Sequence, residues 1–277
     1  MGNIEQHYVR QDDLTDPGDL GGAYDDLPDG VAGLREVVSR LIVHVSWAGR
    51  YGIPPDMPMV RQTQPIARRL QLIQAAYPGS LRTARPPERR TFGTCRDYAL
   101  LLCSMLRSRS IPARVRCGFA TYFDSPYHDH WICEYWSPDE TRWVQVDAQL
   151  DPFHIEQLKV TFDGADLPRG VFLTASQAWR LARAGTVAPE LFGHADASGW
   201  WFLRVDAWRD VLSLVNRQMS AWDSWRDATP PSKVLDGNTL AELDELADAV
   251  IAFEHGADRY ALLTKAASRN MTPPWLA

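Results

Sequence analysis

Cys95 is the side chain in this 277-residue sequence whose setting best fits nucleophilic chemistry. It follows a Gly93-Thr94 bend and stands at the predicted first turn of a helix. The unpaired N–H groups and the positive end of the helix dipole at such a position lower the pKa of a thiol, which favours the reactive thiolate. The same N–H groups could hold the oxyanion that forms when a thiolate attacks a carbonyl. We therefore expect Cys95 to be a nucleophile.

A thiolate nucleophile needs a partner for proton transfer, and His130 and Asp147 are placed to supply one. His130 begins a predicted strand at residues 130–136, and Asp147 ends the next one at 142–146. In neighbouring antiparallel strands, the start of one lies beside the end of the other. His130 is thus the expected base, and Asp147 the acceptor that holds its imidazole in one tautomer. His128 competes, but we interpret it as part of the preceding loop, at the entrance to the site.

No motif identifies a second donor for the oxyanion. Side chains upstream of the nucleophile that qualify by their chemistry are Trp47, Gln62, Gln64 and Tyr77. Trp131, directly after His130, and His128 are further candidates for contact with the substrate.

The elements that must position these residues follow from the spacing of apolar side chains. Helical spacing covers residues 31–47, 66–76 and 95–109, and again 173–184, 201–221 and 240–253, with a capping pattern at Thr239–Glu242. Runs rich in β-branched and aromatic residues predict strands at 113–123, 130–136 and 142–146. The expected fold class is α+β, with helices before and after a small antiparallel sheet.

The block around these residues resembles the transglutaminase-like (transglutaminase-core) superfamily, in its stand-alone bacterial form. The matching motifs are Gly93 with Cys95, the turn Ser-Ile-Pro-Ala-Arg at 110–114, His130 with Glu134, and Trp143 with Asp147. Ser110 stands where the family pattern has glycine. The resemblance implies a papain-like fold, with the nucleophile on the N-terminus of a buried helix that packs against the sheet. It also implies that Cys95, His130 and Asp147 act as nucleophile, base and orienting acid on amide bonds, through a thioester.

Three segments are expected along the chain. Residues 1–30 carry seven Asp and read as an acidic, flexible lead-in. Residues 31–155 form the transglutaminase-like core, and residues 156–277 form a mainly helical extension packed on it.

Composition excludes several classes of partner and cofactor. A net charge of −6 argues against nucleic acid, and no apolar stretch is long enough to cross a membrane. The start of the sequence has no apolar signal segment, so a cytoplasmic location is expected. The four cysteines, at 95, 103, 117 and 133, form no CxxC pair, which predicts neither zinc nor disulfides. We expect no metal, no calcium loop and no cofactor, and the sequence does not indicate an oligomeric state.

These observations predict a cysteine-dependent acyl-transfer enzyme that acts on an amide or ester carbonyl of a small molecule, peptide or protein. Hydrolysis and transfer to an amine both remain open. Two alternatives also stay open: a biosynthetic condensation or elimination on a small metabolite with the same triad, and a non-catalytic interaction module that kept the fold.

Overall fold

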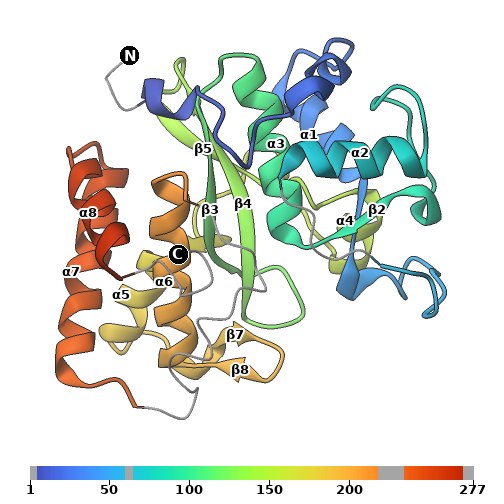
Figure 1. Cartoon of the computed structure of the whole chain (residues 1–277). Helices are drawn as coiled ribbons and strands as arrows, with labels where there is room; N and C mark the ends of the chain where they lie inside the picture. Colours follow the sequence, from blue (N-terminus) through green and yellow to red (C-terminus); the bar gives the residue numbers. More distant parts are fainter. Residues whose placement is uncertain (1–4, 60–64, 218–233, 271–277) are drawn as a thin grey trace. The chain divides into compact units, whose positions relative to one another are not determined.

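A computed structural model describes residues 5–59, 65–217 and 234–270 of the chain (Figure 1). The fold is mixed α+β, which confirms the expected class. Two compact units are formed, the first by Met1–Val115 with Ile132–Leu167 and the second by Arg116–Trp131 with Pro168–Ala277. Strands β3 (Ala113–Ala120) and β4 (Tyr127–Ser137) each contribute residues to both units.

The acidic lead-in folds into two short 3-10 helices, η1 (Glu5–Tyr8) and η2 (Gly18–Tyr24), whose tyrosines Tyr8 and Tyr24 are buried. Asp12 forms an ion pair of 2.7 Å with Arg107. The sequence predicted a flexible segment, whereas these contacts attach residues 5–30 to the first unit. Although the segment is rich in Asp and Gly, its two buried tyrosines provide enough apolar surface to pack against the first unit.

The helices of the first unit surround a short parallel pair of strands. They are α1 (Val31–Ser39), α2 (Ile66–Ala76) and α3 (Cys95–Ser108). The predicted helix at 31–47 is wrong beyond residue 39, because the chain turns there into strand β1 (Ile42–His44), which pairs in parallel with β2 (Thr91–Gly93). A short, mainly apolar run fits a buried strand as well as a helix, and the pairing partner of this one lies about fifty residues away in the sequence.

Strands β4 and β5 (Arg142–Val146) pair antiparallel in the first unit, with Glu134 opposite Gln145. The thiol of Cys103 on helix α3 interacts with that of Cys133 on β4, and both side chains are fully buried, so the buried helix lies against the sheet. Helix α4 (Pro152–Leu158) follows, and its N-cap Asp151 accepts the N–H of His154.

The turn between α3 and β3 explains the departure from the family pattern at Ser110. Its φ is +57°, in the left-handed region that glycine enters without steric cost. Ser110 therefore adopts the backbone conformation for which the family uses glycine.

In the second unit, five strands lie in the order β6-β3-β4-β7-β8, where β6 is Phe172–Thr174, β7 is Phe192–His194 and β8 is Ala197–Ser198. The sequence did not predict these three short strands. Gly118 of β3 is required here, because a Cβ at this position would lie 2.1 Å from the carbonyl oxygen of Leu173.

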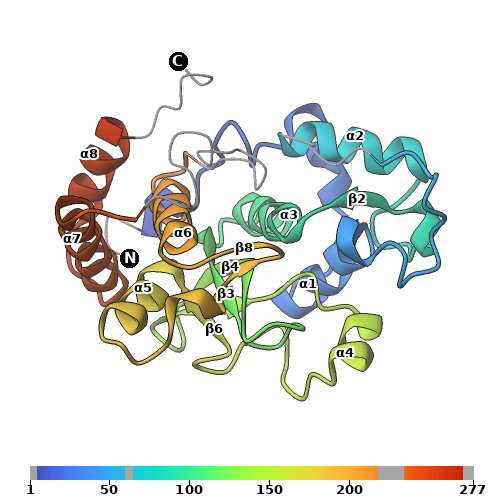
Figure 2. The ribbon, with the colours of Figure 1, turned by 90° about the horizontal axis from the view of Figure 1, so that it is seen from below.

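Four helices complete this unit and lie side by side (Figures 1 and 2). They are α5 (Ala175–Arg183), α6 (Trp200–Leu214), α7 (Gly237–Glu254) and α8 (Tyr260–Asn270). Helix α7 begins earlier than predicted, because Asp236 and not Thr239 is its N-cap and accepts the N–H of Thr239. The predicted helix at 201–221 ends at Leu214, and its last four positions lie outside the described residues. None of the helices among the described residues is long and apolar enough to span a membrane.

Candidate active site

Cys95 is the first residue of helix α3 and comes two residues after the end of β2. Its side chain is buried, with 7% of the residue exposed. Thr94 is the N-cap: its N–H donates to Asp97 Oδ2 at 2.7 Å, and the Asp97 N–H donates to the Thr94 carbonyl at 2.9 Å. This reciprocal pair fixes the first turn of the helix, where the thiol is held.

A buried arginine from α2 joins this turn to the preceding strand. Arg69 Nη1 donates to the Phe92 carbonyl at 2.5 Å, and Nη2 lies 2.8 Å from Asp97 Oδ1. Gly93 is needed between them, because a Cβ there would lie 2.8 Å from Asp97 Oδ2 and 3.1 Å from Arg69 Nη2. Neither Arg69 nor Asp97 was expected from the sequence to shape the site. The spacing Thr94-x-x-Asp97, which varies the usual capping box, was the available signal.

Strand pairing brings Trp47 to the edge of the sheet where Cys95 lies. Because His44 is paired in parallel with Gly93, the residues that follow both strands leave the sheet on the same side. Trp47 ends the 3-10 helix η3 (Val45–Trp47) directly after β1 and is buried. Of the proposed oxyanion donors, it is the one that follows the strand paired with β2, the strand that leads into α3.

The remaining upstream candidates are placed differently or not described. Tyr77 is the C-cap of α2, where its carbonyl accepts from Arg85 at 3.2 Å and its ring lies 5.3 Å from the same guanidinium. Gln62 and Gln64 lie outside the described residues.

His130 and Asp147 are both buried, with 1% of each residue exposed. The ring of His130 packs 4.8 Å from the ring of Phe123. Asp147 directly follows β5, where its N–H donates to the Gly164 carbonyl and its Oδ1 accepts the Gln149 N–H, both at 2.8 Å.

The alternation of side chains gives the strand face of each residue. His130 lies four residues before Glu134 on β4, so both share one face, and Glu134 is opposite Gln145. Asp147 lies two residues after Gln145, just past the end of β5, so the alternation puts its side chain on the same face as Gln145.

His128 belongs to β4 and not to the preceding loop, because it pairs with Gly193 of β7. Its Nδ1 lies 3.0 Å from the Ser125 hydroxyl and its Nε2 lies 3.3 Å from His194 Nδ1. Burial, with the neighbouring His194, lowers the pKa of His128 to about 4. Trp131 is buried and, one residue after His130, lies on the opposite strand face.

A histidine–carboxylate pair that was not among the predicted site residues lies beside Trp47. His154 Nδ1 is 2.9 Å from Asp151 Oδ1 and 3.0 Å from the Tyr51 hydroxyl, and its ring lies 4.3 Å from that of Trp47. Burial alone would raise the pKa of Asp151, but hydrogen bonds from His154 and Tyr51 outweigh it and lower this pKa. The pair is positioned to hold the indole of Trp47 in place.

Comparison with known proteins agrees with the resemblance over part of the chain. Residues 74–148, which include Cys95, His130 and Asp147, match the model of the transglutaminase-like superfamily. A solved structure, a putative cysteine protease from Cytophaga hutchinsonii, is similar at 16% identity with a TM-score of 0.36. That alignment covers 54% of this chain and 43% of the other, less than half of its length. No curated protein matches the chain. At a coarse level, the superfamily match supports a cysteine-dependent enzyme.

Proposed function

We propose that this chain is a cysteine acyl-transfer enzyme that attacks an amide or ester carbonyl. The observation that carries the proposal is the setting of Cys95. It begins a buried helix inside the matched segment, with its first turn fixed by Thr94, Asp97 and Arg69. A structural thiol does not require a turn constrained in this way, whereas a nucleophile gains from fixed geometry.

In the proposed reaction, His130 takes the proton of the Cys95 thiol as the sulfur bonds to the carbonyl carbon. The tetrahedral intermediate collapses when His130 returns this proton to the leaving amine or alcohol, which leaves a thioester on Cys95. Water or an amine then attacks the thioester and gives its proton to His130, and Cys95 is released. Asp147 keeps the His130 ring in the required tautomer.

We assign stabilisation of the oxyanion to the backbone N–H of Cys95 and the indole N–H of Trp47. The first is an N-terminal helix amide, and the second lies at the same sheet edge by the parallel register of β1 and β2. This assignment selects Trp47 over Tyr77 as the upstream donor. The chemistry needs neither a metal nor a cofactor.

Alkylation with iodoacetamide tests the nucleophile. The other three cysteines are fully buried, so in the native protein the reagent should modify Cys95 selectively. The modification rate should follow a titration with a midpoint below the ordinary thiol value of about 8.5, and His130→Ala should move that midpoint upward. A Cys95 that reacts no faster than an exposed thiol, with a midpoint near 8.5, would instead support the interaction module.

A p-nitrophenyl ester tests the covalent step. Wild-type protein should acquire one acyl mass that hydroxylamine removes, because hydroxylamine cleaves a thioester. Cys95→Ala should acquire none, and Asp147→Asn should acylate more slowly while still folding. Equal acylation of wild type and Cys95→Ala would contradict the proposed nucleophile.

A further inference from the structure

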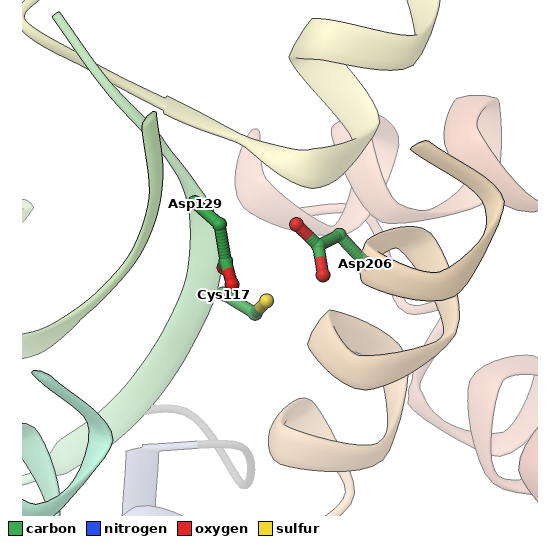
Figure 3. A group of neighbouring side chains, drawn as sticks. All are labelled: Cys117, Asp129 and Asp206. Carbon is green, nitrogen blue, oxygen red and sulfur yellow. The ribbon is translucent and has the colours of Figure 1, made fainter. Parts of the chain in front are cut away.

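A second group of chemically active side chains gathers in the second unit. Cys117 on β3, Asp129 on β4 and Asp206 on α6 turn toward one another (Figure 3). One ligand atom from each residue lies within 4.8 Å of the other two. Cys117 and Asp206 are fully buried, and the Asp129 side chain is 13% exposed. A thiol and two carboxylates are thus concentrated in a region with little access to water.

Arg209 compensates only one side of this group. Its Nη1 lies 3.0 Å from Asp206 Oδ1 and 3.8 Å from Asp129 Oδ2. The other oxygen of each carboxylate, Asp206 Oδ2 and Asp129 Oδ1, is buried and accepts no hydrogen from a nitrogen or oxygen of the described residues, while the Cys117 thiol interacts with the Asp206 carboxylate. Buried polar atoms are normally satisfied, and a carboxylate oxygen left without a partner is costly. One oxygen of each carboxylate and the Cys117 sulfur lie close enough together to share one ion.

The neighbouring ion pair does not supply the missing positive charge. Arg116 is itself bound by two carboxylates, those of Asp210, at 2.7 Å, and of Glu254. Each of these two buried arginines, Arg116 and Arg209, therefore faces two carboxylates. Carboxylates thus outnumber arginines in this region, which favours a cation.

We propose that Cys117, Asp129 and Asp206 bind a divalent transition-metal ion, for which Zn²⁺ has the fitting chemistry. A thiolate excludes Mg²⁺ and Ca²⁺, which take oxygen ligands, whereas Zn²⁺ accepts one sulfur with two carboxylate oxygens. On binding, the Cys117 S–H bond breaks, the sulfur bonds to the metal, and the proton leaves to solvent. Water completes the fourth position. The ion ties β3 and β4 to α6 within the second unit and so stabilises it.

Cobalt provides a test that does not depend on the proposed enzymatic activity. The full chain carrying Cys95→Ser is titrated with Co²⁺, so that the thiol of the proposed active site cannot contribute. We expect one equivalent to bind with the intense charge-transfer absorption of a thiolate–cobalt bond, and Zn²⁺ to abolish this absorption. Adding Cys117→Ser should remove it, and adding Asp129→Asn should weaken binding about tenfold or more. Cys103→Ser, which changes a buried cysteine outside the group, is the matched control and should leave the absorption intact.

Thermal unfolding supplies the second measurement. Zn²⁺ should raise the melting temperature of the Cys95→Ser protein and leave that of a variant with Asp206→Asn unchanged. Without metal, Asp206→Asn should be at least as stable as its parent, because it removes a poorly compensated charge. Absence of stoichiometric Co²⁺ binding, or an absorption that survives Cys117→Ser, would overturn the proposal. Asp129→Asn keeps the test decisive if Cys117→Ser fails to fold, because Asp129 is partly exposed.

Discussion

The ion pair between Arg69 and Asp97 should contribute strongly to stability, because both partners are buried. Their side chains are 0% and 7% exposed, and the two charged atoms lie 2.8 Å apart. Removing one partner of such a pair leaves the other uncompensated in the interior, at a cost of about 3–5 kcal/mol. We expect Arg69→Met and Asp97→Asn each to lower the free energy of unfolding by this amount.

The double variant separates the interaction from other losses. When both charged groups are replaced, no unpaired charge remains in the interior. The double variant should therefore lose less free energy of unfolding than the two single variants together, by about 1–3 kcal/mol. Arg69→Met also loses the bond to the Phe92 carbonyl, so the double variant should not regain full stability.

Urea unfolding monitored by fluorescence gives these free energies, and iodoacetamide modification of Cys95 reports the geometry of the first helical turn. The exposed pair of Arg142 with Asp166 is the matched control, since its side chains are 39% and 49% exposed. Arg142→Met should cost less than about 1 kcal/mol. If Arg69→Met costs no more than this control, or if the two changes add within about 0.5 kcal/mol, the reasoning is refuted.

Three further predictions follow from single positions. The folded pKa of His128 is about 4 against an unfolded value of 6.5, so the unfolded state binds more protons between these values. The free energy of unfolding therefore keeps the whole contribution of neutral His128 above pH 6.5 and loses it as the pH drops toward 4. At about 1.36 kcal/mol per pKa unit, the loss is up to about 3 kcal/mol. His128→Gln should flatten this part of the curve of urea midpoint against pH, and an unchanged slope would contradict the assignment. Gly118→Ala should destabilise the protein by about 2 kcal/mol or more in urea, because its Cβ would push against the Leu173 carbonyl; a neutral effect would show that β6 moves freely. Trp47→Phe keeps the ring but loses the indole N–H, so the acylation rate should fall about 10²-fold while the melting temperature changes little. An unchanged rate would remove Trp47 as the oxyanion donor.

Much of the fold around the candidate site was predictable because it depends on local patterns. The helical spacing after Cys95 and the strands on either side of residues 137–141 agree with the structure. Each of these features is encoded within about fifteen residues by apolar periodicity or by turn chemistry.

The features that were not predicted depend on partners far away in the sequence. Strand β1 exists because Thr91–Gly93 pairs with it, and the first turn of α3 is braced by Arg69, 26 residues before Cys95. The group of Cys117, Asp129 and Asp206 comes from three elements with no common spacing. Zinc sites are recognised in a sequence by closely spaced Cys and His pairs, and this group contains none.

The way in which strand β4 is paired predicts how a truncated chain would behave. One edge of this strand binds β5 through residues 133–137 and β7 through residues 127 and 128, while β3 is bordered by β6. A fragment that stops at residue 155 would strip β6 and β7 away and leave unpaired backbone groups on two apolar strands. Unpaired strand edges bind other chains, so the truncated protein should aggregate on expression. Co-expression of the missing segment should restore solubility, because its strands would pair with the open edges.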